Sequence, residues 1–184
     1  MLEKNEIIQS ALRNLKIEEL NPMQEASLEQ ATGRKDVILL SPTGSGKTLA
    51  YLLPLLLTLK PNDDNVQVLI LVPSRELALQ IDSVFKAMGT SWKTCCCYGG
   101  HPIAEEKKSI LSNHPAIIIG TPGRITDHLS KGNFNPETIE TLIIDEFDKS
   151  LEFGFHDEMA EIITQLPGLK KRILMRQRFP NLQD

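Results

Sequence analysis

The stretch Val37–Thr48 reads VILLSPTGSGKT, and the apolar segment Leu49–Leu59 follows it directly. This order predicts a strand, a glycine-rich turn and a helix, the setting in which a P-loop holds a phosphate chain. Gly44 and Gly46 allow backbone N–H groups to point inward at a phosphate, and the opening helix adds the positive end of its dipole. A Gly/Ser turn before a capped helix is the alternative. We predict a nucleoside triphosphate site.

The residues of this turn have separate predicted roles. Lys47 would place a point charge beside the β- and γ-phosphates, and the Thr48 hydroxyl would be a ligand of Mg²⁺. Ser41 stands where the usual eight-residue pattern has its first glycine. The residues expected to contact the nucleotide here are Thr43, Gly44, Ser45, Gly46, Lys47 and Thr48.

Composition limits the class of protein. The chain has 184 residues, of which 41% are hydrophobic and 24% charged, as in one soluble globular domain. No run approaches the ~18 apolar residues of a membrane span, and the charged N-terminus does not look like a secretion signal, so we expect a cytoplasmic protein without a membrane partner. The net charge of −4 excludes a globally basic nucleic-acid binder, but not a local binding track. The adjacent Cys95, Cys96 and Cys97 lack metal-site spacing and are interpreted as small apolar strand residues.

Short apolar runs alternate with helical patterns along most of the chain. The predicted strands are Val37–Leu40, Val68–Val72, Thr94–Tyr98, Ala116–Ile119, Thr141–Ile144 and Arg172–Met175. The predicted helices are Gly46–Leu59, Glu76–Met88, Ile103–Leu111, Arg124–Leu129 and Gly154–Leu166, with two more near Glu3–Asn14 and Pro22–Ala31. Because several strand runs are apolar on both faces, we predict an α/β fold, a parallel sheet with helices on both faces. In such a sheet ligands bind at the carboxyl ends of the strands.

One of the loops that follow these strands is acidic. Asp145 and Glu146 come directly after the run Thr141–Ile144. Opposite a P-loop, Asp145 can hold Mg²⁺ through water, and Glu146 is then placed to polarise the water that attacks the γ-phosphorus. The alternative is a helix N-cap with acidic first-turn residues, a role open to Asp145 and Asp148.

Five strings occur in one order along the chain, followed by Gly154-Phe155: Thr43–Thr48 (TGSGKT), Pro73–Ala78 (PSRELA), Gly99-Gly100, Thr121–Arg124 (TPGR) and Asp145–Asp148 (DEFD). With this order and spacing the chain resembles the first RecA-like domain of a DEAD-box ATP-dependent RNA helicase. The resemblance implies a RecA-like P-loop domain over residues 1–184, with a helical region that reads adenine in residues 1–31. It also implies a monomer that works with a second RecA-like domain. That domain is absent here and would carry an arginine finger, so we expect the chain alone to hydrolyse ATP poorly.

The resemblance also assigns residues. Catalysis would fall to Lys47, Asp145 and Glu146, with ATP and Mg²⁺ as cofactors. Gln24 would match the donor and acceptor of adenine and select ATP over GTP, although a solvent-facing helix residue is the alternative. Sequence-independent contacts to the RNA backbone would come from Arg75, Gly99, Gly100, Thr121, Gly123 and Arg124.

The chain departs from the family pattern after its last predicted strand. Arg176-Gln177-Arg178 stands where the family has Ser-Ala-Thr, whose hydroxyls bond the last aspartate of the acidic motif. The arginines could pair with Asp148 instead, or turn outward. Two other functions stay open: a different P-loop ATPase, against which the TPGR and PSRELA loops count, and a catalytically silent RNA- or protein-interaction module.

Overall fold

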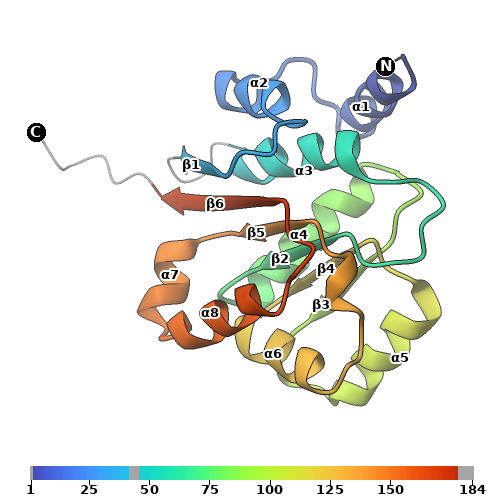
Figure 1. Ribbon diagram of the computed structural model, residues 1–184. Coiled ribbons are helices and arrows are strands. Elements are labelled where there is room, and N and C mark those ends of the chain that lie inside the picture. Colours follow the sequence, from blue (N-terminus) through green and yellow to red (C-terminus); the bar gives the residue numbers. More distant parts are fainter. Residues whose placement is uncertain (1, 42–45, 178–184) are drawn as a thin grey trace, which may run out of the picture.

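Six strands form one parallel sheet in the computed structural model, which describes residues 2–41 and 46–177 (Figure 1). The strand order is β1-β6-β5-β2-β4-β3, and every neighbouring pair is parallel. The strands are β1 (Val37–Ser41), β2 (Val68–Leu71), β3 (Thr94–Cys97), β4 (Ile117–Gly120), β5 (Thr141–Ile144) and β6 (Lys171–Gln177). The predicted α/β class is therefore confirmed.

Helices cover both faces of the sheet (Figure 1). Residues of α1, α3 and α4 pack in one apolar cluster with alternate strand residues such as Val68 and Ile70. Residues of α5, α6 and α8 pack in a second cluster with Leu69 and Leu71, which point the other way. The helices are α1 (Leu2–Leu15), α2 (Pro22–Glu29), α3 (Lys47–Thr58), α4 (Arg75–Ala87), α5 (Ile103–Asn113), α6 (Pro122–Ser130), α7 (Phe147–Glu152) and α8 (His156–Thr164).

Every predicted strand is present: Thr141–Ile144 has the predicted bounds, and the ends of the others are shifted by at most two residues. Two short elements were not predicted: helix α7 (Phe147–Glu152) and a 3₁₀ turn at Pro136–Thr138. Both are too short to produce a helical period in the sequence. Among the described residues, no helix has the length and apolar content needed to cross a membrane.

The strand order divides the carboxyl edge of the sheet into two halves. In the β1–β6–β5 half, Ser41 pairs with Gln177 and Ile144 pairs with Leu174, so the ends of β1 and β5 flank β6 at the same edge of the sheet. In the β2–β4–β3 half, Gly120 lies between Leu71 and Cys97. The loops after these three strands, with their predicted RNA-contacting residues, therefore lie side by side.

Candidate nucleotide and RNA site

Lys47 joins the two acidic residues at the end of β5. It is the first residue of α3, and its Nζ lies 3.3 Å from Asp145 Oδ1 and 3.4 Å from Glu146 Oε1. Asp145 is fully buried, whereas the Lys47 side chain keeps 25% of its surface exposed. A partly exposed ammonium between two carboxylates can move toward a phosphate without breaking the core. The structure thus brings together the three residues predicted to be catalytic.

Tyr51 is a member of this group that the sequence did not reveal. Its hydroxyl donates a hydrogen bond of 2.7 Å to Asp145 Oδ2, and the residue lies one helical turn after Thr48 on α3. Burial raises the pKa of Tyr51 well above its usual value, and the Asp145 carboxylate raises it further. The phenol therefore stays protonated as a donor to Asp145, one of the two residues predicted to hold Mg²⁺.

Glu146 has a strained backbone. Its φ of 48° and ψ of 49° lie in the left-handed region, which a residue with a Cβ adopts at a cost of about 1–2 kcal/mol. Its own N–H donates to Asp145 Oδ1 at 2.8 Å, and it is the N-cap residue of α7 without a side-chain capping bond. Such strain clusters at functional sites. Asp145 accepts this one N–H but is not the cap residue, so the capping alternative accounts for its geometry only in part.

Gln24 holds the N-terminal region against the start of α3. Its Nε2 donates to the Gly46 carbonyl at 3.1 Å, and its Oε1 accepts from the N–H of Asn21 at 3.0 Å in a capping box. Gly46 has φ 72°, and a Cβ there would lie 2.6 Å from Gln24 Nε2. Gln24 is buried, so the solvent-facing alternative is wrong. Within residues 2–41 and 46–177, the side-chain amide uses one of its two hydrogens and one of its two lone pairs in these bonds.

Arg176 pairs with Asp148, which is the first of the two alternatives predicted from the sequence. Its Nε lies 3.1 Å from Asp148 Oδ1 and 3.3 Å from Oδ2, although the arginine side chain is mostly exposed. An ion pair thus replaces the hydroxyl contacts of the family pattern. Arg178 lies outside the described residues, as do three predicted nucleotide contacts, Thr43, Gly44 and Ser45.

The predicted RNA-contacting residues meet in the other half of the edge. The Arg75 guanidinium lies over the Tyr98 ring, 5.0 Å from its centroid, and so links the start of α4 to the exposed Gly99-Gly100 turn. Thr121 is the N-cap residue of α6 and its side chain makes no capping bond, as a phosphate-binding helix start would require. Gly123, in the first turn of that helix, has open space where a Cβ would be.

Arg124 points inward. Its side chain is 13% exposed, and its Nε lies 3.1 Å from Glu106 Oε1 and 3.1 Å from the Tyr98 carbonyl. The expected free guanidinium on the surface is therefore not observed. Glu106, which pairs with Arg124 and is hydrogen-bonded to the buried His128, forms with Arg124 a second charged group that the sequence did not reveal.

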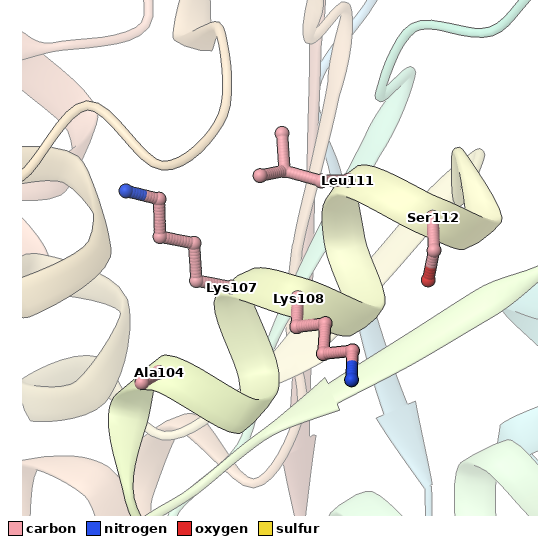
Figure 2. Close-up of a pocket in the computed structure, with 5 residues that line it drawn as sticks. All are labelled: Ala104, Lys107, Lys108, Leu111 and Ser112. Atoms are coloured by element: carbon pink, nitrogen blue, oxygen red, sulfur yellow. The ribbon is translucent and has the colours of Figure 1, made fainter.

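A hollow of about 450 Å³ lies beside this region on α5 (Figure 2). Lys107 and Lys108 line it, but their ammonium groups point in different directions (Figure 2). The two charges do not converge on one ligand, so we assign no site there.

The chain is thus an α/β domain with charged residues gathered at the carboxyl edge of a parallel sheet, and comparison with known proteins identifies the family. The family described as DEAD/DEAH box helicase matches residues 21–176. The chain belongs to this family.

Relatives of known name are RNA helicases of the same family. The chain is 34% identical over 179 residues to the ATP-dependent RNA helicase CshA of Listeria monocytogenes, covering 96% of this chain and 34% of that protein. It is 31% identical over 175 residues to the DEAD-box ATP-dependent RNA helicase CshA of Bacillus subtilis, covering 94% and 35%. The chain thus spans about a third of the length of these relatives.

Two crystal structures share the fold. A DEAD box protein from Methanococcus jannaschii matches with a TM-score of 0.86 at 29% identity, covering 94% of this chain and 48% of that one. A hypothetical ATP-dependent RNA helicase from Sulfolobus tokodaii matches with a TM-score of 0.84 at 31% identity, covering 96% and 52%. The RecA-like expectation for the fold is confirmed.

Proposed function

We propose that this chain is the ATP- and RNA-binding RecA-like domain of an ATP-dependent RNA helicase. The observation that carries the proposal is the convergence of Lys47, Asp145 and Glu146 at the carboxyl edge of the sheet. The residue types fit the group that they would hold: a cation for phosphates, and a carboxylate and a hydroxyl for Mg²⁺. Residues 1–31 would be the adenine-reading region, and the protein would act as a cytoplasmic monomer.

In the proposed reaction Lys47 leaves the two carboxylates for the β- and γ-phosphates. Mg²⁺, held by Thr48 and through water by Asp145, would neutralise charge that develops on the phosphates. Glu146 would then be free to accept a proton from the attacking water. A second RecA-like domain would supply the arginine finger and the rest of the RNA track.

Nucleotide binding by this chain tests the first half of the proposal. Lys47→Ala should weaken Mg·ATP binding about 100-fold or more, because it removes the charge-assisted contact to the phosphates. Lys131→Ala, which replaces an exposed lysine at the C-terminal end of α6, is the matched control and should bind ATP normally. Titration with a fluorescent ATP analogue measures both. Equal binding by the Lys47 variant and the unmodified chain would contradict the proposal.

Base selection tests the role of Gln24. The unmodified chain should prefer ATP to GTP, and Gln24→Ala should erode that preference, because the amide supplies both a donor and an acceptor to adenine. Competition between the two nucleotides measures it. Equal affinity of the unmodified chain for ATP and GTP would remove the adenine assignment.

RNA binding by the chain tests the second half. We expect weak binding of single-stranded RNA with little base preference, because the proposed contacts reach the sugar-phosphate backbone only. Fluorescence anisotropy with homopolymers of different bases measures the preference. Strong selection of one sequence would contradict a backbone track.

A further inference from the structure

Glu106 is a buried carboxylate whose two oxygens are both occupied by N–H donors. Oε1 lies 2.7 Å from His128 Nε2 and 3.1 Å from Arg124 Nε. Oε2 lies 2.8 Å from the backbone N of Tyr98 and 2.8 Å from His101 Nε2. Two hydrogen bonds and two ion pairs, from the Tyr98–His101 loop and from helix α6, therefore meet on one side chain.

Two of these contacts come from the loop that carries Gly99 and Gly100. Glu106 holds the N–H of Tyr98 before the turn and the imidazole of His101 after it. Arg124 donates to the carbonyls of the same two residues, Tyr98 and His101. The pair formed by Glu106 and Arg124 thus grips the loop at both ends. The turn between them needs such support, because Gly100 has φ 99°, a conformation open to few residues.

We propose that Glu106 is a positioning residue for RNA binding. It fixes the Gly99-Gly100 loop in the shape that meets the RNA backbone, and it turns Arg124 away from RNA to brace the same loop. Arg124 therefore acts through the loop and not by a direct phosphate contact. The inference rests on the proposed function, because it concerns the same RNA track.

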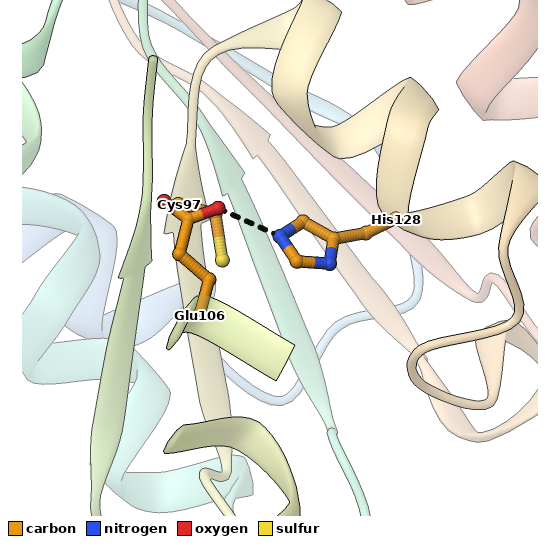
Figure 3. A group of neighbouring side chains, drawn as sticks. All are labelled: Cys97, Glu106 and His128. Carbon is orange, nitrogen blue, oxygen red and sulfur yellow. Dashed lines mark hydrogen bonds and ion pairs between the residues drawn. The ribbon is translucent and has the colours of Figure 1, made fainter. Parts of the chain in front are cut away.

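A metal site is the competing interpretation of this region. Figure 3 shows Glu106 and His128 joined by their hydrogen bond with the Cys97 side chain beside them, and all three are buried. The Arg124 cation is already on the carboxylate, where it would oppose a metal ion. The side-chain hydrogen bond with Cys95, together with burial, raises the pKa of Cys97, so its thiol stays protonated and is a poor ligand. Hydrogen bonding accounts for the cluster without a metal.

The direction in which RNA affinity changes when Glu106 loses its negative charge tests the proposal. Glu106 carries a negative charge near a surface proposed to bind a polyanion. If the carboxylate acted only through its charge, Glu106→Gln would strengthen RNA binding. If it positions the loop, Glu106→Gln should weaken RNA binding about fivefold to tenfold, because the neutral amide keeps only one acceptor oxygen and loses the ion pair with Arg124.

The matched control is the neighbouring Glu105, whose side chain is exposed. Glu105→Gln removes the same charge and should leave RNA affinity unchanged or slightly higher. Both variants should bind ATP like the unmodified chain, since the nucleotide residues lie in the other half of the edge. A Glu106→Gln variant that binds RNA as well as the unmodified chain, with normal ATP binding, would overturn the inference.

The salt dependence of RNA binding separates a positioning role of Arg124 from a phosphate contact. A lost phosphate contact to single-stranded RNA lowers the slope of log K against log salt concentration by about 0.7. Arg124→Gln should weaken binding with the slope unchanged. Adding Glu106→Gln to it should cause little further loss, because both residues act through one loop. A reduced slope with additive losses would assign Arg124 to a phosphate and overturn the inference.

Further measurements cover the other ways in which the test could fail. Where Glu106→Gln prevents folding, His101→Ala replaces it, because His101 is partly exposed and its loss leaves the buried bonds intact. This variant should weaken RNA binding about twofold to threefold with ATP affinity and melting temperature unchanged; unchanged RNA affinity would count against the inference. Stoichiometric zinc in the purified chain, lost in Cys97→Ser, would overturn it in favour of a metal site. Failure of the unmodified chain to bind RNA would instead contradict the proposed function.

Discussion

The two halves of the carboxyl edge each contain a buried carboxylate, and the cations that pair with these carboxylates differ in how firmly they are held. In the β1–β6–β5 half, Asp145 shares the Lys47 ammonium with Glu146, and that ammonium is partly exposed. In the β2–β4–β3 half, Glu106 is paired with Arg124, which is almost covered. The first cation can leave its carboxylate for an incoming phosphate, whereas the second is fixed by backbone carbonyls.

The choice of cation follows the same division. A lysine ammonium is a point charge on a flexible stem and can change partners with a small movement. The arginine guanidinium makes several bonds in fixed directions, which suits the bracing of a loop. We therefore call the β1–β6–β5 half of the edge the exchangeable half, because its cation can change partners. We call the β2–β4–β3 half the rigid half, because its cation is held in place. Both lie at the ends of neighbouring parallel strands.

The largest expected effect that tests this contrast is on stability. Glu106→Ala should lower the free energy of unfolding by about 3–5 kcal/mol, because it leaves a buried guanidinium without its partner. Lys47→Ala should cost only about 1 kcal/mol, since Asp145 keeps its bonds from Tyr51 and from the backbone of Glu146. Urea unfolding measures both. The exposed Glu105→Ala is the control, and equal losses for the Glu106 and Lys47 variants would erase the contrast.

Tyr51 provides the next test, because its hydroxyl is a fixed donor to Asp145 in the exchangeable half. Tyr51→Phe should cost about 1 kcal/mol of stability and should raise the Mg²⁺ concentration that half-saturates ATP binding, since Asp145 loses the hydrogen bond that orients its carboxylate. Denaturation and a magnesium titration measure the two effects. The control is Tyr98→Phe, because the Tyr98 hydroxyl bonds no other described residue. If only stability changes, Tyr51 supports the core and does not position the metal ligands.

A smaller and opposite effect is expected at Glu146. Glu146→Asn should raise stability by about 0.5 kcal/mol, because asparagine tolerates the left-handed backbone better than glutamate does. His114, with φ 49° at the end of α5, offers a matched control, and His114→Asn should give a similar gain. Only the Glu146 variant should lose ATP hydrolysis when the domain is joined to a second RecA-like domain. If Glu146→Asn instead lowered the free energy of unfolding, the contacts of the Glu146 side chain would stabilise the protein by more than its left-handed backbone destabilises it.

The exchangeable half was largely predictable from sequence. Lys47, Asp145 and Glu146 each follow or adjoin a strand that is apolar on both faces, and parallel strands bring their carboxyl ends to one edge. Tyr51 was missed because a tyrosine inside an apolar helical run is typical of core packing. Its hydroxyl contacts depend on the distance between α3 and β5, which no local pattern encodes.

The rigid half was predictable only as a set of loops. The adjacent Glu105 and Glu106 belong to one polar helical stretch, and nothing in their spacing indicates which of them is buried. The inward turn of Arg124 depends on that burial, because Glu106 and the loop carbonyls supply its partners. Tertiary contacts therefore decide a role that the TPGR motif alone assigns to phosphate binding.

The smallest expected effect concerns the ion pair between Arg176 and Asp148, at the end of β6 in the exchangeable half. The arginine is 60% exposed and the pair is screened by solvent, so Arg176→Ala should change the free energy of unfolding by less than about 0.5 kcal/mol. The difference should vanish in 1 M salt, where charges separated by more than about 3 Å are largely screened. Arg172 lies on the same strand as Arg176 and pairs with the exposed Asp36, so Arg172→Ala is the control variant.

A pair this weak can still affect function by restraining Asp148 beside the acidic loop. Replacing Arg176 by serine should therefore leave stability and ATP affinity unchanged, because neither depends on the pair. In a protein that joins this domain to a second RecA-like domain, it should alter RNA-stimulated ATP hydrolysis, because Asp148 regains the hydroxyl partner of the family pattern. Hydrolysis at the unmodified rate, with and without RNA, would mean that the contact between Arg176 and Asp148 does not affect how RNA binding changes ATP hydrolysis.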